Sequence, residues 1–588
     1  MNLLLLSVTL LALFCGPLLY VAARRRLGLL SFLDGFVLVT ISGLVLLEVL
    51  PETLESGGLW ALLFLALGAL GPTLLENQLH HARRAHLGTL LFSIGGLIMH
   101  SVGDGTALAP QPGGGEIHLA LALAIAVHSI PVGLAVWWLL YPVFGFALPA
   151  LAIGGMAGGT LLGYAFSDAL GGWLGATVWA WLQALVAGSI LHVIFGRPHL
   201  DDFSSERRSK PPFEGLGNLL AVAALVLLET LHPAAHTDHA EHAAHAGHEH
   251  HAVLHPLLDL LLAIAPALLA ATLAGIALAA WAAGRGGDGG AWGLLIGEDA
   301  ESRYRRRLFD GAPASTNLLQ LIAMPALSLI GLAVSLALLG PALTLARLVA
   351  VPAIALLVAV LLARLFPHRP QPLFRFDAPV IADELCEVHT HGPATAPMPA
   401  RAPLRQSLPT NPASRHWLWP FEAQLPWLVC GLLIGAVGLP YLEHSLWSTL
   451  PPPAQLLLAT ATGALLGASA AGAAPVALML LALGSPAGVA LALLIASAAG
   501  LPRRLWLLRK LHGRRHATLY AALLLVGAFG AGWLLDAGLS LPVMATPSAS
   551  GIVPALSLGA LGLMAAVSLL RRGGRELFAP LFKTYPTS

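Results

Sequence analysis

Apolar stretches long enough to cross a lipid bilayer, about 18 residues or more, recur along the whole 588-residue chain. Only 10% of the residues are charged, whereas about a quarter are charged in a soluble globular protein. This composition excludes an ordinary water-soluble enzyme. In lipid every backbone polar group needs an internal partner, and apolar helices meet that need. The sequence therefore predicts an all-α fold, a polytopic transmembrane helical bundle.

We expect about 15–16 spans in two membrane domains. In the first domain the apolar stretches lie near 2–20, 30–50, 58–75, 88–109, 117–140, 145–166, 173–196 and 215–231. In the second they lie near 256–283, 317–340, 342–366, 425–440, 453–500, 517–537 and 551–570. The stretch 453–500 is too long for one crossing. Its Gly, Ala and Pro residues fit one full span with a re-entrant hairpin near 473–488, and they fit three short, tightly packed helices equally well.

The basic residues predict the orientation of the chain, because they are concentrated in every second loop. The intervening loops, which contain neither Lys nor Arg, are 51–57, 110–116, 167–172, 232–255, 441–452 and 538–550. By the positive-inside rule the cationic loops face the cytoplasm, the N-terminus lies outside and the C-terminus lies inside. Arg347, near the outer end of its span, breaks this pattern. We expect a multi-pass protein of the cell inner membrane.

The polar segments divide the chain into domains. We expect an eight-span membrane domain over 1–231, a His-rich outward-facing linker over 232–255 and a second membrane domain over 256–588 with a Pro-rich cytoplasmic loop at 367–424. The net charge of +1 does not indicate a nucleic-acid partner. Three cysteines are too few for a disulfide framework or a thiolate metal cluster. The oligomeric state, a homo-oligomer included, is open.

Two of the predicted spans carry ionisable residues. His100 and Asp104 are four residues apart, so they share one face of a helix. His128 precedes Pro131, which removes a backbone hydrogen bond and frees a carbonyl near residue 127. Ionisable groups inside a membrane usually face a cavity, a partner or an ion, and two imidazoles with a carboxylate suit Zn²⁺. The alternative is that His100 bonds Asp104 and His128 bonds a carbonyl.

The order of these motifs resembles the ZIP (zinc/iron permease) family of divalent-metal transporters. His100–Gly105 is similar to the family's fourth-span motif HNxxDG, and His128–Gly133 is similar to its fifth-span motif HExPHE. Gly43–Glu52 is similar to GxxLxxxxxHLLPE, with Glu48 where a histidine is usual. The resemblance covers 1–231. It implies eight spans with both termini outside, as the count of apolar stretches and the charge pattern indicate independently.

The chain also departs from the ZIP motifs. Ser101 replaces an asparagine, Ser129 replaces a glutamate, and Val132 with Gly133 replaces the second His-Glu pair. In the family two adjacent metal sites share these groups. The resemblance therefore implies at most a single reduced site, formed by His100, Asp104, His128 and, as a further candidate, Glu48. Such a site would bind metal more weakly or with different selectivity, or would belong to a domain that no longer transports.

A histidine-rich tract separates the two domains. Its candidate metal ligands are His236, His239, His242, His245, His248, His250 and His251. Imidazoles with a pKa of about 6.5 are largely neutral at pH 7 and can bind metal. This composition is typical of metal-binding tracts. The alternative is an incidental His- and Ala-rich linker.

The second domain resembles permeases of the arsenical and heavy-metal efflux type. Met479–Leu494 is similar to their pattern LxxxGxSxGxALAFL, and Ser315–Gln320 is a candidate degenerate counterpart from a first repeat. Such permeases often have cysteines before this pattern, where Ser469–Pro475 stands here, so thiolate chemistry is absent. The resemblance covers 256–540. Helix packing through small residues alone explains the same composition.

The chain contains no HExxH helix, GxSxG elbow or Walker lysine. We therefore expect neither an enzyme nor a cofactor, and an ion gradient, the membrane potential or downhill flow would drive transport. Our hypothesis is a secondary transporter of a divalent metal, with zinc preferred, across the bacterial inner membrane. Its partners are the metal ion and the lipid bilayer. The alternatives are a non-transporting protein that senses or buffers metal and a heavy-metal efflux permease; import and export are both open.

Overall fold

The computed structural model describes residues 2–23, 26–58, 60–78, 82–109, 119–166, 175–195, 211–231, 254–283, 300–309, 313–366, 417–443, 446–467, 469–538 and 551–582. All regular secondary structure in these ranges is helical, which confirms the predicted all-α fold.

The helices follow the predicted apolar stretches. The first half contains α1 (Asn2–Ala23), α2 (Leu27–Leu44), η1 (Val45–Val49), α3 (Leu50–Gly57), α4 (Trp60–Gln78), α5 (Ala82–Ala107), α6 (Leu119–Phe144), α7 (Ala147–Ala165), α9 (Ala176–Phe195) and α10 (Pro211–Leu231). The second half contains α11 (Leu254–Ala283), α13 (Ala300–Phe309), α14 (Ala314–Ala326), α15 (Leu329–Leu365), α16 (Trp419–Glu443), η5 (Leu446–Thr449), α17 (Pro452–Leu466), α18 (Ala470–Ala482), α19 (Ala487–Ala498), α20 (Leu501–His512), α21 (Arg514–Gly538), α22 (Ile552–Arg572) and α23 (Gly574–Phe582).

Eight helices of the described ranges are long and apolar enough to cross a membrane. They are Leu3–Ala23, Leu27–Gly57, Ala147–Ala165, Leu257–Trp281, Leu329–Leu365, Trp419–Leu439, Arg514–Gly538 and Ile552–Arg572. Shorter apolar segments lie at Trp60–Ala69, Ser129–Trp138, Thr177–His192, Pro211–Leu227 and Ala470–Ala482. The polytopic helical bundle is thus confirmed, and the total of about 15–16 spans stays a prediction.

Glycines let the helices of the first half pack closely. A Cβ atom at Gly16 would collide with the backbone of Leu134, so α1 lies directly on α6. A Cβ atom at Gly163 would collide with the carbonyl of Val102, so α7 lies directly on α5. Small residues at helix crossings let backbones approach in this way inside membranes. These two crossings bring α1, α5, α6 and α7 together.

A π-helical turn, η1, interrupts the long second helix just before Pro51. Proline has no N–H and cannot bond to the carbonyl four residues earlier, and a wider turn at this point absorbs the lost bond. The N–H of Leu50 accordingly bonds to the carbonyl of Val45, five residues back. Glu48 belongs to this turn.

The predicted span 317–340 is two helices, not one. α14 ends at Ala326 and α15 begins after Ser328, whose hydroxyl accepts a hydrogen bond from the N–H of Gly331 at 3.2 Å. A serine in this position caps the first turn of a helix and favours a new start there. α15 itself bends sharply at Gly340, where φ is 79°, next to the boundary predicted from the sequence.

The stretch 453–500 contains three short helices, α17, α18 and α19. α18 and α19 are joined at Leu483–Pro486, pack against each other and are almost completely buried. α15 and α16 flank α18, whereas α17 and α21 flank α19. Three short helices are therefore present, and the last two form a hairpin over the predicted region 473–488.

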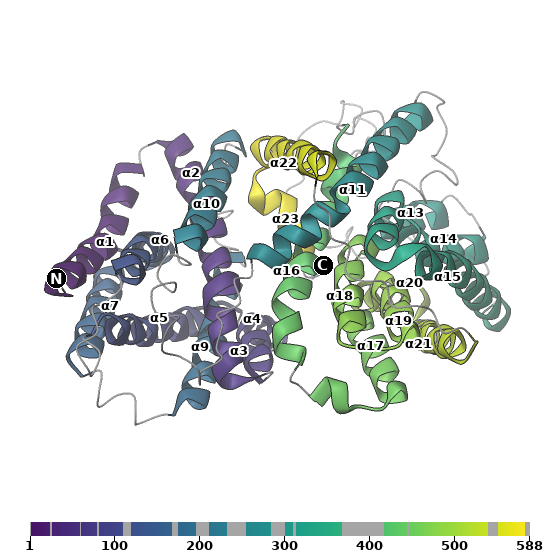
Figure 1. Cartoon of the computed structure of the whole chain (residues 1–588), viewed down its shortest axis with the longest axis horizontal. Helices are drawn as coiled ribbons and strands as arrows, with labels where there is room; N and C mark the ends of the chain where they lie inside the picture. Colours follow the sequence, from purple (N-terminus) through teal and green to yellow (C-terminus); the bar gives the residue numbers. More distant parts are fainter. Residues whose placement is uncertain are drawn as a thin grey trace, which may run out of the picture.

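The last two helices of the chain bridge its two halves. Figure 1 shows α1–α10 grouped on one side and α11–α21 on the other, with α22 and α23 between them. α22 packs against both α10 and α11. On α23, the guanidinium of Arg575 donates two hydrogen bonds to the Asp34 carboxylate of α2, at 2.8 and 3.0 Å. Arg571, at the end of α22, pairs with Glu422 of α16.

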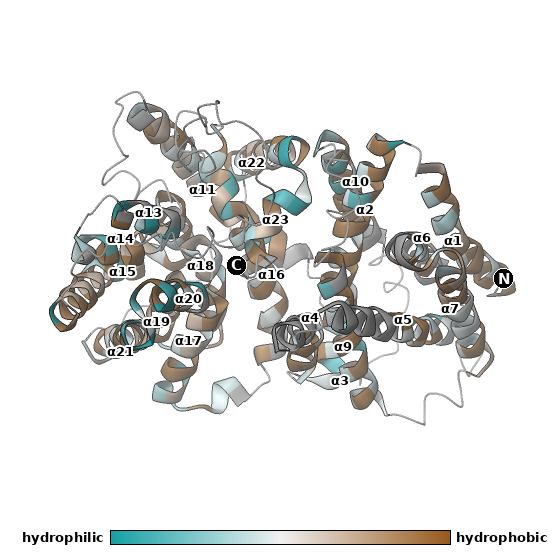
Figure 2. Ribbon diagram, turned by 180° about the vertical axis from the view of Figure 1, so that it is seen from behind, coloured by the Kyte–Doolittle hydropathy of each residue, from teal (hydrophilic) through white to brown (hydrophobic). Residues whose placement is uncertain are grey.

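Several short helices of the second half are amphipathic, among them α13, α20 and α23. Figure 2 shows hydrophilic residues concentrated on α13 and α20, whereas the long helices are mostly hydrophobic. On α20 the side chains of Arg509 and Lys510 are exposed, and those of Leu507 and Leu508 are buried. The Lys510 ammonium lies 4.2 Å from the centre of the Trp506 ring. This pattern suits a helix that lies at a membrane surface.

Candidate functional site

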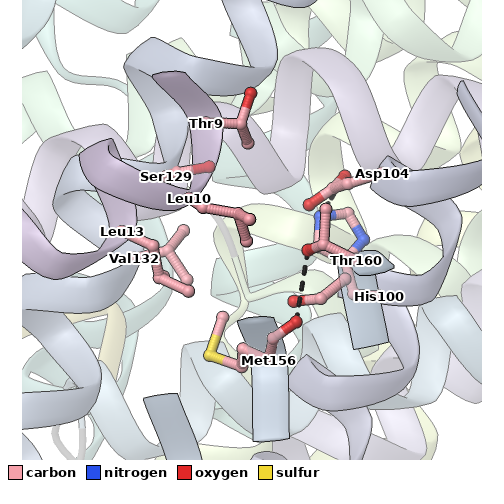
Figure 3. Close-up of a pocket in the computed structure, with 10 residues that line it drawn as sticks. Thr9, Leu10, Leu13, His100, Asp104, Ser129, Val132, Met156 and Thr160 are labelled. Carbon is pink, nitrogen blue, oxygen red and sulfur yellow. Dashed lines mark hydrogen bonds and ion pairs between the residues drawn. The ribbon is translucent and has the colours of Figure 1, made fainter. Parts of the chain in front are cut away.

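A small cavity lies where α1, α5, α6 and α7 meet. Figure 3 shows polar and apolar side chains from all four helices around it. The lining residues are Thr9, Leu10, Leu13, His100, Ser101, Asp104, Ser129, Val132, Met156 and Thr160. The cavity therefore contains two of the residues that the sequence analysis selects, His100 and Asp104.

His100 and Asp104 lie one turn apart on α5 and face the same side, as their spacing predicts. The Nε2 atom of His100 is 3.5 Å from Oδ1 of Asp104. This separation is within ion-pair range but longer than the 2.7–3.2 Å of a typical N–H···O hydrogen bond. The side chains are 28% and 15% exposed. The two groups thus lie in contact at the cavity, which is compatible with the alternative that His100 bonds Asp104.

The hydroxyl groups of the lining give the cavity its acceptor character. Ser129 donates its hydroxyl proton to the carbonyl of Ile125 at 2.7 Å, and Thr160 donates to the carbonyl of Met156 at 3.2 Å. Thr9 and Ser101 donate in the same way to carbonyls one turn earlier. A hydroxyl has one proton and two lone pairs, so after this donation the oxygen can only accept or bind a cation. The cavity accordingly combines a carboxylate, an imidazole and hydroxyl oxygens.

Gly133, one of the positions where the chain differs from the ZIP pattern, lies where α1 packs against α6. Gly133 stands where the family has its second glutamate, and a Cβ atom there would collide with the carbonyl of Leu13 on α1. Because α1 occupies this space, no side chain fits at position 133. Val132, the neighbouring departure, lines the cavity with an apolar surface.

The side chains of the other predicted ligands lie outside the described part of the chain, so their place at the cavity stays a prediction. His128 lies on α6 one turn before Val132, and its side chain is outside the described part. Glu48 lies in η1, whose main contacts are with α2, α3 and α9, and its side chain is also outside that part. The tract residues His236, His239, His242, His245, His248, His250 and His251 fall outside the described ranges.

Among the described side chains, no group of three or more His, Cys, Asp or Glu residues could hold a metal ion. At the cavity the described lining offers two such residues, His100 and Asp104, and its other polar groups are hydroxyls. Thr9, Met156 and Thr160 were not predicted from the sequence. A single threonine or methionine in an apolar helix forms no recognisable sequence motif. Only the packing of the helices brings these side chains close to His100 and Asp104.

Comparison with known proteins supports the interpretation of the second half. Residues 304–537 match the family model ArsP_1, described as a predicted permease. The match covers less than half of the chain. Together with the apolar helices, it supports a multi-pass membrane transporter with a permease-like segment. No curated protein and no solved structure matches the chain. The resemblance of 1–231 to the ZIP family stays a prediction.

Proposed function

We propose that the chain is a secondary transporter of a divalent metal cation, with zinc as the first candidate, and that the cation binds in the cavity between α1, α5, α6 and α7. One observation carries this proposal. The described lining contains a carboxylate, an imidazole and hydroxyl oxygens, and it contains no Lys or Arg. Such a lining lowers the energy of a cation and raises that of an anion.

The role of each group follows from its chemistry. The carboxylate of Asp104 supplies the negative charge, and the imidazole of His100 supplies the nitrogen donor that zinc prefers. The hydroxyl oxygens of Thr160 and Ser129 replace water around the ion. His128, one turn from Val132, is the further ligand that the sequence predicts. Rocking of one helix group against another would open the site to each side in turn, as in other secondary transporters.

Metal flux in proteoliposomes tests the site. The purified full chain is reconstituted, and uptake of radioactive zinc is measured under an imposed gradient. We expect uptake above that of protein-free vesicles, and a fall of about tenfold or more in a variant that combines His100→Ala with Asp104→Asn. His192→Gln is a matched control, because this histidine also lies in a membrane helix but contacts the carbonyl of Ala69, at 3.1 Å, instead of the cavity.

Unchanged flux in the double variant would show that the cavity is not the metal site. Absence of zinc uptake by the wild-type chain, with manganese, cobalt and cadmium also negative, would reject metal transport altogether. The bacterial inner membrane and an outside N-terminus belong to the same proposal. The orientation is tested in a variant with Cys15, Cys386 and Cys430 replaced by Ser. Single cysteines introduced there at Gly58 and Gly513 are labelled from one side of the membrane, and the two positions should react from opposite sides.

A second candidate function, heavy-metal efflux, is favoured by the permease match over 304–537. It predicts metal flux that survives the substitutions at His100 and Asp104 and is lost by changes within the matched segment. A third, metal sensing or buffering without transport, predicts zinc binding without flux. In that case binding measured by calorimetry should disappear when 232–255 is replaced by a histidine-free linker. For the transporter the same replacement should lower the number of bound ions and leave flux in saturating zinc unchanged.

A further inference from the structure

The permease-like segment contains an internal repeat that ends each time in a buried arginine. Ser328 and Ser485 each follow a helix of 13 residues, α14 and α18. Each serine is followed three residues later by a glycine and 19 residues later by an arginine, Arg347 or Arg504. The chain thus builds one arrangement twice: a short helix, a break, a second helix and then a helix with the arginine.

The two copies also share their backbone geometry. A glycine with positive φ separates the second helix from the arginine-bearing helix in both copies, Gly340 at 79° and Gly500 at 51°. A proline follows closely in each case, Pro341 and Pro502. Left-handed glycines turn the chain where other residues would be strained, and proline begins the next helix. In both repeats the arginine thus follows a sharp turn of the chain, and the side chain of Arg347 returns to the preceding helices.

Arg347 lies at the break between α14 and α15 and is completely buried. Its guanidinium donates to the Ser335 hydroxyl at 2.5 Å, to the Gly331 carbonyl at 3.4 Å and to the carbonyl of Ala326, the last residue of α14. Its Nε–H is buried without a hydrogen-bond acceptor. The C-terminal end of α14 thus stabilises the positive charge only through neutral dipoles.

Arg504 has even fewer partners. Its side chain is 4% exposed, and both Nε and one terminal nitrogen are buried without an acceptor. Its neighbour Arg503, by contrast, is exposed and pairs with Glu301 at 2.8 Å. Within the described residues, no carboxylate pairs with Arg504 or with Arg347. A buried charge is usually neutralised by an opposite charge. Each of these two sites therefore carries a positive charge without a neighbouring carboxylate, and an anion would be stabilised there.

We propose that the permease-like segment binds and conducts a small anion, whose charge is balanced first by one of the two repeat-related arginines and then by the other. The charge pattern of the loops places Arg504 toward the cytoplasmic side and Arg347 toward the outer side. An anion moving between them would supply the missing acceptors for the guanidinium N–H groups. A divalent cation would be repelled by both. The proposal concerns a different half of the chain from the metal cavity and does not depend on it.

Tracer flux tests the proposal with the full chain in proteoliposomes. The probes are radioactive chloride, inorganic phosphate and sulfate, each under an inward gradient, with zinc measured in parallel. We expect uptake of at least one anion above that of protein-free vesicles. Arg347→Gln and Arg504→Gln should each lower that uptake about tenfold or more, because glutamine keeps hydrogen-bond donors but has no charge. Arg347→Lys should retain uptake within about threefold. The control Arg509→Gln changes an exposed arginine on the same helix as Arg504 and should have no effect.

The possible outcomes distinguish an electrostatic role of the two arginines in anion uptake from a purely structural role at the helix breaks. If the arginines only hold the helix breaks together, Lys and Gln at position 347 will act alike, which overturns the proposal. Unchanged anion uptake in both Gln variants, or no uptake of any of the three anions by the wild-type chain, also overturns it. If Arg347→Gln does not yield a monodisperse protein, Arg504→Gln alone decides. Zinc uptake that persists in the Gln variants shows that the metal site is separate, so failure of one proposal is distinguishable from failure of the other.

Discussion

The Arg575–Asp34 pair offers a direct test of how the two halves are joined. Arg575 lies on the last helix, α23, and Asp34 lies on α2 near the beginning of the chain. The same guanidinium donates to the carbonyl of Ile194 at 2.8 Å, and the backbone N–H of Arg575 donates to Glu214 at 2.9 Å. Arg575→Gln removes the charge and the two-pronged bond. We expect α23 to detach locally from α2 and α10 more often in this variant.

The free energy lost in the Arg575→Gln variant can be judged from how deeply the Arg575–Asp34 ion pair is buried. The side chains of Arg575 and Asp34 are 25% and 14% exposed. Burial lowers the pKa of the Arg575 guanidinium, but the charges of Asp34 and Glu214 outweigh this effect and raise the pKa overall, so the arginine stays ionised. Breaking a fully buried ion pair costs about 3–5 kcal/mol, and an exposed pair contributes about 0–1 kcal/mol. For this intermediate exposure we expect a loss of about 2 kcal/mol in the free energy that keeps α23 docked.

Hydrogen exchange measures this local free energy. In the purified full chain, the amides of Gly574–Phe582 should exchange about 30-fold faster after Arg575→Gln, since each 1.4 kcal/mol corresponds to about tenfold. Glu576→Gln is the control on the same helix. Glu576 is 62% exposed, and its pair with Arg572 crosses the break between α22 and α23, so about twofold faster exchange is expected for this exposed pair.

Equal exchange in the Arg575→Gln variant and the wild-type chain would refute the reasoning. It would mean that apolar contacts between α22 and α10, and not the ion pair, hold α23 in place. A double-mutant cycle with Asp34→Asn separates the pair from the other bonds of Arg575. A coupling energy below about 0.5 kcal/mol would assign the effect to those other bonds.

Two further perturbations test the packing. Gly133→Ala should lower the melting temperature by an amount equivalent to about 1–3 kcal/mol, because its methyl group would collide with the backbone of α1. The control Gly154→Ala lies at an open position of α7 and should be neutral or slightly stabilising. Tyr304→Phe removes a buried 2.7 Å hydrogen bond to Nε2 of His512 and should cost about 1–2 kcal/mol; Tyr520→Phe removes a buried hydroxyl that has no acceptor and should cost nothing. Thermal unfolding in detergent measures both pairs, and the reverse order within either pair would contradict the packing described above.

The positions of the helices could be predicted from the sequence because each reflects a local property. Apolar runs identify helices in a bilayer regardless of how they pack. The predicted boundary between the spans 317–340 and 342–366 likewise falls at the sharp bend of α15, because Gly340 and Pro341 both act on the local backbone. The break before Ser328 was not predicted. A single serine within an otherwise apolar stretch does not by itself indicate that a new helix begins there.

The site could be predicted only in part. The spacing of His100 and Asp104 fixes their common face on one helix, and the structure places both at the cavity. The rest of the lining depends on which helices cross there. Thr9 and Thr160 come from α1 and α7, and their presence follows from glycine crossings between helices far apart in the sequence. Periodicity along a single helix contains no information about such contacts.

Arg347 has one interpretation in the sequence and another in the structure. In the sequence it is only an exception to the charge pattern of the loops. In the structure it is a fully buried cation at a helix break, with a counterpart at the same repeat position in Arg504. The cost of burying one unpaired guanidinium is large, and two such groups at corresponding positions are hard to explain by packing alone.

The two halves thus have opposite electrostatics, and this contrast limits how one chain could work as a whole. Under the two proposals above, a cation would be stabilised by Asp104 in the first half and repelled by Arg347 and Arg504 in the second, which disfavours a single pathway for one ion through both halves. The contact of α23 with α2 gives the halves a mechanical link instead, because movement of α2 changes the distance from Asp34 to Arg575. Because Arg575 lies outside the cavity lining, we expect Arg575→Gln to leave the ratio of zinc to manganese uptake in proteoliposomes unchanged; a changed ratio would contradict a purely mechanical link.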